Sequence, residues 1–152
     1  MPLVTAAALF CLIVAVGDGD SLTARCNAQA PERVRIAAID APELRQAWGR
    51  RARQQLAALC LGQRAEIQPQ GRDVYGRTLA QVRCRGRDVA SEQVHAGLAW
   101  VHPSQVAGHP QLAATAEQAR RNHTGLWSQQ RPVAPWNYRR RHPPRYRSSA
   151  RN

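Results

Sequence analysis

Two strand-like segments joined by a four-residue turn constrain the fold of this chain more than any other feature. Residues Cys11–Val16 and Ser21–Cys26 are dominated by apolar and small side chains, and the turn Gly17–Asp20 with the sequence Gly-Asp-Gly-Asp separates them. An Asp-Gly pair between two such segments is the strongest short signal for a β-hairpin. A hairpin centred on the middle of this turn pairs residues whose numbers add to 37, so Cys11 would face Cys26. Opposed Cβ atoms lie about 4.5–5.5 Å apart, from which a small adjustment allows a disulfide.

The cysteines favour two disulfides and an oxidising compartment. If Cys11 pairs with Cys26, the other two cysteines of the chain, Cys60 and Cys84, pair with each other. None of the four forms a C-x-x-C pair, which disfavours a zinc or thioredoxin-type site. An even count that can be paired in this way is typical of proteins outside the reducing cytosol. The alternative is four reduced thiols buried in a core.

The remaining periodicity predicts a small barrel with helices attached. Residues Arg33–Ile39 alternate between two faces as a strand does, and Trp48–Leu61 carries one apolar face of a helix with Gly62 at its end. Further strands are expected at Arg64–Pro69 and Arg77–Cys84, and further helices near Val89–Ala96 and Pro110–Asn122. This order of elements predicts an α+β, mainly β fold: a five-stranded barrel of the oligonucleotide-binding (OB) type with three helices.

The charge of the chain points to an anionic partner. All 22 basic residues are arginines, and the 10 acidic residues leave a formal net charge of +12. A chain this basic is expected to bind nucleic acid. Residues 131–152 hold seven arginines and no acidic residue, and they are also rich in proline. We expect this tail to be disordered, and to act either as a solubilising segment or by attracting phosphate.

The apolar start of the chain favours export. Residues Leu3–Val16 are almost all apolar, but fourteen residues are too few to span a bilayer, which needs about 20. The first arginine is Arg25, so the basic start of a signal peptide is missing. We interpret residues 1–10 as an incomplete signal peptide, residues 11–130 as the folded domain, and the location as periplasmic or extracellular. No membrane partner is expected.

Three short segments carry charged residues in a pattern that is informative only in combination. They are Gly17–Ser21 (GDGDS), Arg35–Glu43 (RIAAIDAPE) and Asp73–Arg77 (DVYGR). Each alone has an ordinary explanation as a turn, a solvated strand or a helix cap. Their joint order and spacing, together with the helix placement between about Cys11 and Trp127, resemble the thermonuclease family of staphylococcal nuclease-like domains.

The resemblance implies a calcium site. Asp20 and Asp40 match the two carboxylates that hold the ion in that family, and Ala41 matches a ligand that acts through its backbone carbonyl. Asp18 matches an acidic residue of secondary role near the metal. Calcium takes 6–8 oxygen ligands including water, so two carboxylates and a carbonyl suffice if water and phosphate complete the shell.

The resemblance also implies residues that act on a phosphodiester. Arg35 and Arg77 match the arginines that grip the scissile phosphate, and Glu43 matches the carboxylate that orients or deprotonates the attacking water. A guanidinium fork matches two phosphate oxygens at once and stays charged at any working pH. Tyr75 matches a tyrosine that contacts phosphate.

The chain departs from the family pattern where an aromatic pair follows the second helix. Pro103 stands where one tyrosine of the pair would fall, so Trp100 or His102 is assigned to stacking on bases. The alternative for His102 is an ordinary surface position.

These residues predict a calcium-dependent endonuclease that hydrolyses DNA and RNA with little sequence specificity and leaves 3′-phosphate products. The enzyme is expected to be a monomer without an obligate protein partner. The alternative is a non-catalytic nucleic-acid-binding module of the same fold. Such degenerate domains lose the carboxylates or the arginines, whereas this chain keeps Asp20, Arg35, Asp40, Glu43 and Arg77.

Overall fold

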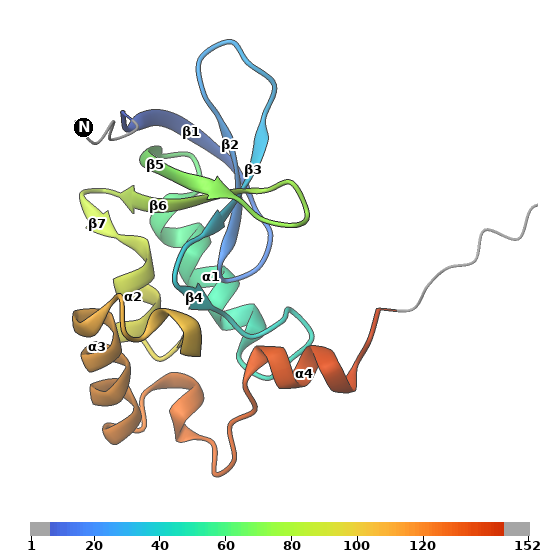
Figure 1. The fold of residues 1–152 in the computed structure, drawn as a ribbon, viewed down its shortest axis with the longest axis vertical. Helices are drawn as coiled ribbons and strands as arrows, with labels where there is room; N and C mark the ends of the chain where they lie inside the picture. Colours follow the sequence, from blue (N-terminus) through green and yellow to red (C-terminus); the bar gives the residue numbers. More distant parts are fainter. Residues whose placement is uncertain (1–6, 145–152) are drawn as a thin grey trace, which may run out of the picture.

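The computed structural model describes residues 7–144 and shows a barrel with four α-helices gathered toward one end of it, the lower end in Figure 1. Residues 1–6 of the predicted signal segment and 145–152 of the predicted tail lie outside the described residues. The strands are β1 (Leu9–Val16), β2 (Ser21–Arg25), β3 (Glu32–Ile36), β4 (Ile39–Asp40), β5 (Arg64–Arg72), β6 (Thr78–Cys84), β7 (Arg87–Asp88) and β8 (Trp100–Val101). The α-helices are α1 (Gly49–Cys60), α2 (Val89–His95), α3 (Pro110–Arg121) and α4 (Pro135–Arg141), with short 3-10 turns at Pro103–Gln105 and Gly125–Ser128.

Five strands close into the predicted barrel. The sheet order is β3-β2-β1-β5-β6-β7, and β3 also pairs in parallel with β6, which closes the ring. Strands β4 and β8 form a separate antiparallel pair beside it. The predicted fold class is confirmed, and α4 is a helix beyond the three that were expected.

The β1–β2 hairpin confirms the predicted register near the cysteines. Leu12 faces Arg25, as a pairing sum of 37 requires, and Cys11 is bonded to Cys26 with their Cα atoms 4.4 Å apart. A bulge between Ile13 and Ala15 shifts the register by one residue closer to the turn. Bulges bend a strand and increase its twist, which suits a strand that curves around a small barrel.

The prediction of one strand over Arg33–Ile39 is wrong. Strand β3 ends at Ile36, and Ala38 adopts a left-handed backbone conformation with φ of 74° before the short strand β4 begins. The turn at Ala38 bends the chain between the two strands, and the Ala38 carbonyl accepts a hydrogen bond from His102 N at 3.1 Å.

The core joins the barrel interior to α1 and α2. Helix α1 buries Ala52, Leu56 and Cys60, spaced as one helical face, among strand residues such as Ile13 and Ile67. Cys60 is bonded to Cys84 at the end of β6, which ties the end of α1 to the barrel as predicted. This packing leaves one side of the barrel open at the β1–β2 turn and at β4.

Helix α4 corrects the expectation of a disordered basic tail. It lies in a segment whose average composition suggests disorder, but Ala134 and Pro135 are buried and Trp136 packs against Trp100 at a ring separation of 5.5 Å. Proline is favoured at the first turn of a helix because its missing N–H has no partner there in any case. A few apolar anchors therefore order the segment in spite of its charge. Over residues 7–144, no helix has both the length and the apolar character that crossing a membrane requires.

Candidate active site

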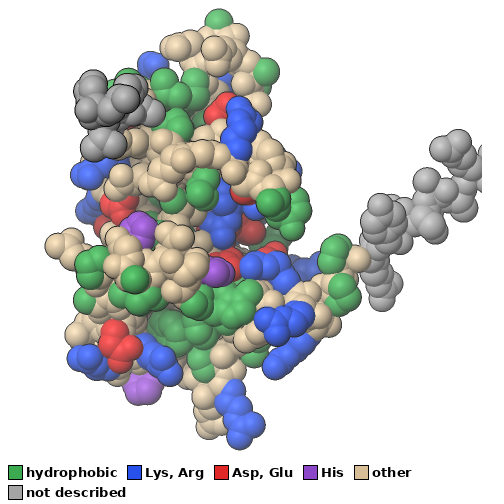
Figure 2. All heavy atoms as spheres, in the orientation of Figure 1, with side chains coloured by type: hydrophobic (Ala, Val, Ile, Leu, Met, Phe, Trp, Pro, Cys, Tyr) green, Lys and Arg blue, Asp and Glu red, His purple; other side chains and the backbone are tan. Residues whose placement is uncertain are grey.

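A cleft of about 430 Å³ opens on the side of the barrel where the β1–β2 turn, β3, β4 and α4 meet. Figure 2 shows arginine and acidic side chains mixed in this region, between the barrel and α4. Four carboxylates and four arginines line the cleft together with one tyrosine: Asp18, Asp20, Arg33, Arg35, Asp40, Glu43, Tyr75, Arg77 and Arg139. Because carboxylates and arginines line the same cleft, it can bind both cationic and anionic groups.

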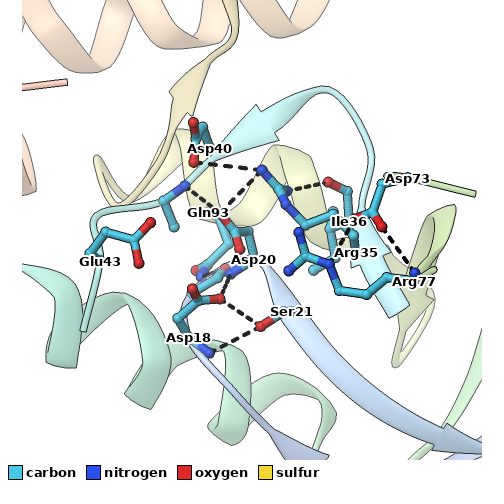
Figure 3. A network of polar contacts seen from close by, with 12 residues as sticks. Asp18, Asp20, Ser21, Arg35, Ile36, Asp40, Glu43, Asp73, Arg77 and Gln93 are labelled. Carbon is cyan, nitrogen blue, oxygen red and sulfur yellow. Dashed lines mark hydrogen bonds and ion pairs between the residues drawn. The ribbon is translucent and has the colours of Figure 1, made fainter. Parts of the chain in front are cut away.

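Asp20 lies at the end of the β1–β2 turn with only 3% of its surface exposed. Its Oδ2 accepts a hydrogen bond of 2.7 Å from the backbone N–H of Ala41, so the turn and the segment after β4 hold each other in place (Figure 3). Burial raises the pKa of Asp20 well above its ordinary value, Arg35 opposes the rise, and the nearby Asp18 adds to it. A buried carboxylate of this kind becomes easier to ionise when a cation approaches.

Asp18 has the opposite tendency. Its burial acts to raise its pKa, but hydrogen bonds with Asp20 and with the hydroxyl of Ser21 outweigh burial and hold the pKa below the ordinary value. The Ser21 hydroxyl donates to Asp18 Oδ1 at 2.6 Å. The two carboxyl groups of the turn are therefore unequal: Asp18 favours the ionised form and Asp20 resists it.

Close packing fixes the position of this turn. A Cβ on Gly19 would lie 2.5 Å from Ala52 Cβ and 2.8 Å from Ala41 Cβ, so only glycine fits there. Gln93 of α2 is buried, and its Nε2 donates to the Gly19 carbonyl at 2.7 Å and to the Ala52 carbonyl at 2.9 Å. Gln93 thus anchors the turn to two helices. Sequence analysis missed it because a single glutamine in a helix carries no pattern.

Arg35 bridges the two aspartates. Its Nη2 lies 3.5 Å from Asp20 Oδ2 and 3.5 Å from Asp40 Oδ1, while its Nη1 donates to the Ile36 carbonyl at 2.8 Å. Because Asp40 follows the turn at Ala38, its carboxylate returns to the region that Arg35 reaches from β3. The structure therefore brings Asp20, Arg35 and Asp40 together.

Glu43 lies in the loop before α1 and turns its side chain toward the cleft (Figure 3). Gln46 holds this loop in place through two hydrogen bonds. Its side-chain Oε1 accepts from the Glu43 backbone N–H at 3.1 Å, and its backbone N–H donates to the Glu43 carbonyl at 2.8 Å. Gly49, the first residue of α1, approaches the same carbonyl so closely that an added Cβ would lie 1.9 Å from it. The position of Glu43 therefore depends on a glycine six residues later.

Replacing Gly49 with alanine is expected to displace the loop that carries Glu43. Overpacking of a buried position typically costs about 1–3 kcal/mol, and the same shift moves the carboxylate away from the cleft. Urea denaturation measures the loss of stability, and limited proteolysis of the loop around Glu43 measures its displacement. Gly108→Ala is the matched control, because an added Cβ there meets no atom closer than 3.9 Å. Equal stability of the two variants would contradict the close packing at Gly49.

Arg77 and Tyr75 reach the cleft from the turn between β5 and β6. Asp73 orders this turn, accepting from the backbone N–H groups of Tyr75 at 3.0 Å and Arg77 at 2.9 Å and pairing with Arg77 Nε at 2.7 Å. The Arg77 guanidinium lies 5.4 Å from the centre of the Tyr75 ring. Within the described residues no hydrogen bond engages the Nη atoms of Arg77, so they are available to a ligand. Tyr75 is 74% exposed, and among residues 7–144 it is the one aromatic residue lining the cleft.

Trp100 and His102 are not among the residues that line the cleft. Trp100 packs at 4.5 Å from Trp127 and 5.5 Å from Trp136, and His102 lies 5.3 Å from the same Trp136 ring. Their assignment to base stacking stays a prediction, and it would require space beside Trp136. In the structure, their contacts hold α4 against the barrel.

Arg139 of α4 is a cleft residue that sequence analysis did not predict. Its Nη2 donates to Asp40 Oδ2 at 2.6 Å, and its Nη1 donates to Asp40 Oδ1 at 3.1 Å and to Glu43 Oε1 at 2.8 Å. The hydrogen bonds to Asp40 raise the pKa of Arg139 further above its ordinary value. Its partners lie almost a hundred residues earlier in the chain, and no local signal connects them.

The residues present fit a hard cation only as a partial site. Asp20 and Asp40 are buried carboxylates that both lie 3.5 Å from Arg35. Carboxylate oxygens are donors that suit calcium or magnesium. Among residues 7–144, no three Asp, Glu, His or Cys side chains converge as a preformed metal cluster. An ion held here would complete its shell with backbone, water or phosphate oxygens.

The fold and the cleft define the class of protein: an OB-type barrel domain with a charged cleft on its side. A family model described as staphylococcal nuclease homologue matches residues 33–129, which end before α4. The chain belongs to the staphylococcal nuclease family, as the sequence resemblance indicated.

Several relatives with similar sequences are named as nucleases. A micrococcal nuclease from Shigella flexneri is 36% identical, covering 84% of this chain and 79% of its own. An uncharacterized endonuclease from Haemophilus influenzae is 34% identical, covering 86% of this chain and 72% of its own. A further relative, whose name does not state an activity, is protein ParB from Escherichia coli; it is 37% identical, covering 84% of this chain and 77% of its own.

Proposed function

We propose that this protein is a calcium-dependent endonuclease that hydrolyses phosphodiester bonds of DNA and RNA with little sequence specificity and leaves 3′-phosphate products. One observation carries the proposal: the two buried aspartates, the two arginines and Glu43 line the same cleft although they come from four separate segments. The names of relatives as endonuclease and micrococcal nuclease support it. A binding module without catalysis would not need buried acidic groups beside its arginines.

The arginines of the cleft bind and polarise the phosphate. Within the part of the chain that the structure describes, the Nη atoms of Arg77 donate no hydrogen bond, and Arg35 holds its guanidinium beside Asp20. As water attacks, extra negative charge develops on the phosphoryl oxygens, and preorganised cationic donors stabilise that charge. Arg35 is held in place by two carboxylates and a backbone carbonyl, so little reorganisation is needed during the reaction.

Glu43 orients the attacking water and accepts its proton. Its carboxylate is partly exposed, with 34% of the side chain accessible, so water can reach it. The loop fixed by Gln46 and Gly49 sets the position of the carboxylate relative to the arginines. General-base catalysis by a positioned carboxylate contributes typically about 10²–10⁴-fold to the rate.

Asp20, Asp40 and the carbonyl of Ala41 would hold the calcium ion. When bound, a divalent ion supplies Lewis-acid stabilisation of the phosphoryl oxygens and neutralises the buried carboxylates. The high pKa of Asp20 is consistent with this role, because a carboxylate that resists ionisation alone gains most from a nearby cation.

Metal removal tests the proposal directly. The oxidised full-length protein should cleave single- and double-stranded DNA in the presence of calcium, and excess chelator should abolish cleavage. Addition of calcium beyond the chelator should restore it. Binding of DNA without cleavage under both conditions would support the non-catalytic module instead. Cleavage at the same rate with and without chelator would reject the metal site but not the nuclease activity.

The two disulfides support a location outside the reducing cytosol. Cys60–Cys84 joins two core positions, Cys11–Cys26 joins a core position to a partly buried one, and three of the four cysteines are fully buried. Such bonds form and persist in oxidising compartments. We therefore propose that the enzyme acts in the periplasm or outside the cell, as a monomer.

A further inference from the structure

Arg139 uses the carboxylate oxygens that the proposed metal site requires. Both oxygens of Asp40 accept from its guanidinium, at 2.6 Å and 3.1 Å, and Glu43 accepts at 2.8 Å. Two cationic groups cannot take the same lone pairs of Asp40 Oδ2, and they also repel each other at short range. The contact seen here is therefore incompatible with full coordination of an ion by Asp40.

We propose that α4 is a latch whose Arg139 competes with the divalent cation for Asp40 and Glu43. This inference rests on the proposed calcium site. In the closed state Arg139 neutralises the acidic side of the cleft and occupies one carboxylate oxygen of Glu43. Cation binding releases Arg139 from Asp40 and frees the Glu43 carboxylate.

The other contacts of α4 keep Arg139 close to the cleft after release. Trp136 packs against Trp100 and His102, and Gln46 Nε2 donates to the Val133 carbonyl at 2.6 Å just before the helix. A tethered group binds with a high effective concentration, so even a weak ion pair competes with a free ion. The latch therefore needs no strong contact of its own.

The exposure of Arg139 makes the contact reversible. Its side chain is 46% exposed, whereas Asp40 is almost fully buried. A guanidinium that is already half in water regains its hydration easily on leaving, so the cost of release falls on the buried carboxylate and is offset when a divalent ion replaces Arg139. The buried Asp40 keeps Arg35 at 3.5 Å in either state, and its second cationic partner is either Arg139 or the divalent ion.

Calcium affinity measured by isothermal titration calorimetry tests the latch. The oxidised full-length protein, Arg139→Gln and the control Arg140→Gln are titrated with calcium chloride alone, without nucleic acid. Arg140 lies on the same helix and makes no ion pair within the described residues, so its loss removes equal charge without opening the latch. We expect Arg139→Gln to bind calcium about five- to tenfold more tightly and Arg140→Gln to stay within about twofold of the parent.

Tryptophan fluorescence gives a second readout of the same event. If calcium releases Arg139, the surroundings of Trp136 on the same helix change, so its emission should shift on titration of the parent protein and shift less in Arg139→Gln. The change should be lost in Trp136→Phe, while circular dichroism shows that each variant is folded.

The outcomes separate the latch from the proposed function. Equal calcium affinity of the parent and Arg139→Gln would overturn the latch and leave the calcium site intact. An equal gain in Arg140→Gln would also overturn it, because the effect would then be one of general charge. Absence of calcium binding in all three proteins would reject the calcium site and the competition together.

Discussion

Replacing Glu43 with glutamine is expected to lower the rate of DNA cleavage by about 10²–10⁴-fold, the usual contribution of a general base. Glutamine has nearly the shape of glutamate but cannot accept the proton of the attacking water. The fold should persist, because Glu43 is partly exposed and its single ion pair, to Arg139, is of the kind that contributes about 0–1 kcal/mol. Single-turnover cleavage in saturating calcium and thermal unfolding measure the two properties.

Glu117→Gln is the matched control for this substitution. Glu117 also forms one ion pair with an arginine, Arg121, but it lies on α3 and is not among the residues that line the cleft. This control should retain the parental cleavage rate. A Glu43→Gln variant that is folded and cleaves at more than half the parental rate would exclude Glu43 as the general base. It would not contradict the roles proposed for the arginines and aspartates.

Removing the second disulfide by the double substitution Cys60→Ala and Cys84→Ala should lower the free energy of unfolding by about 3 kcal/mol. The bond closes a loop with a sequence separation of 24, and in the chain-entropy account its loss enlarges the unfolded ensemble. Both positions are fully buried, so alanine leaves no polar group unsatisfied but does leave some empty volume. Urea denaturation without reductant measures the loss.

Denaturation of the parent protein in dithiothreitol provides the comparison. Reduction opens both disulfides, so the parent should become at least as unstable as the double variant, and reductant should destabilise the variant further by opening the Cys11–Cys26 bond. A loss below about 1 kcal/mol in the double variant would show that the α1–β6 linkage contributes little. Because α1 packs next to the turn that carries Asp20, the variant should also lose activity at lower temperature than the parent.

The barrel was predictable because its signals are local. Alternation, the Asp-Gly turn and the glycines after helices all act over a few residues, and they located β1, β2, β5, β6 and the first three helices to within a few residues. The pairing of Cys11 with Cys26 followed from the hairpin register alone. The error in β3 has a simple origin: an alanine with positive φ has no sequence signature, so the turn at Ala38 could not be foreseen.

The candidate site was predictable where the family pattern marks it and not elsewhere. Asp20, Arg35, Asp40, Glu43, Tyr75 and Arg77 were named from three short motifs, and all six line one cleft. Gln93 and Arg139 were missed, since each acts through partners far away in the sequence. Trp100 and His102 were assigned from their order after the second helix, yet the structure packs both against Trp136.

The fold class, the disulfide pairing and the set of chemical groups could be predicted because they depend on residue type and on spacings that the chain keeps in any environment. How those groups meet depends on contacts between distant segments. The left-handed turn at Ala38 brings Asp40 beside Arg35, the close approach of Gly49 sets Glu43, and a helix ordered by Pro135 and Trp136 carries Arg139 onto both carboxylates. Each of these depends on packing between segments that are distant along the chain, and such contacts form only when the whole core is assembled.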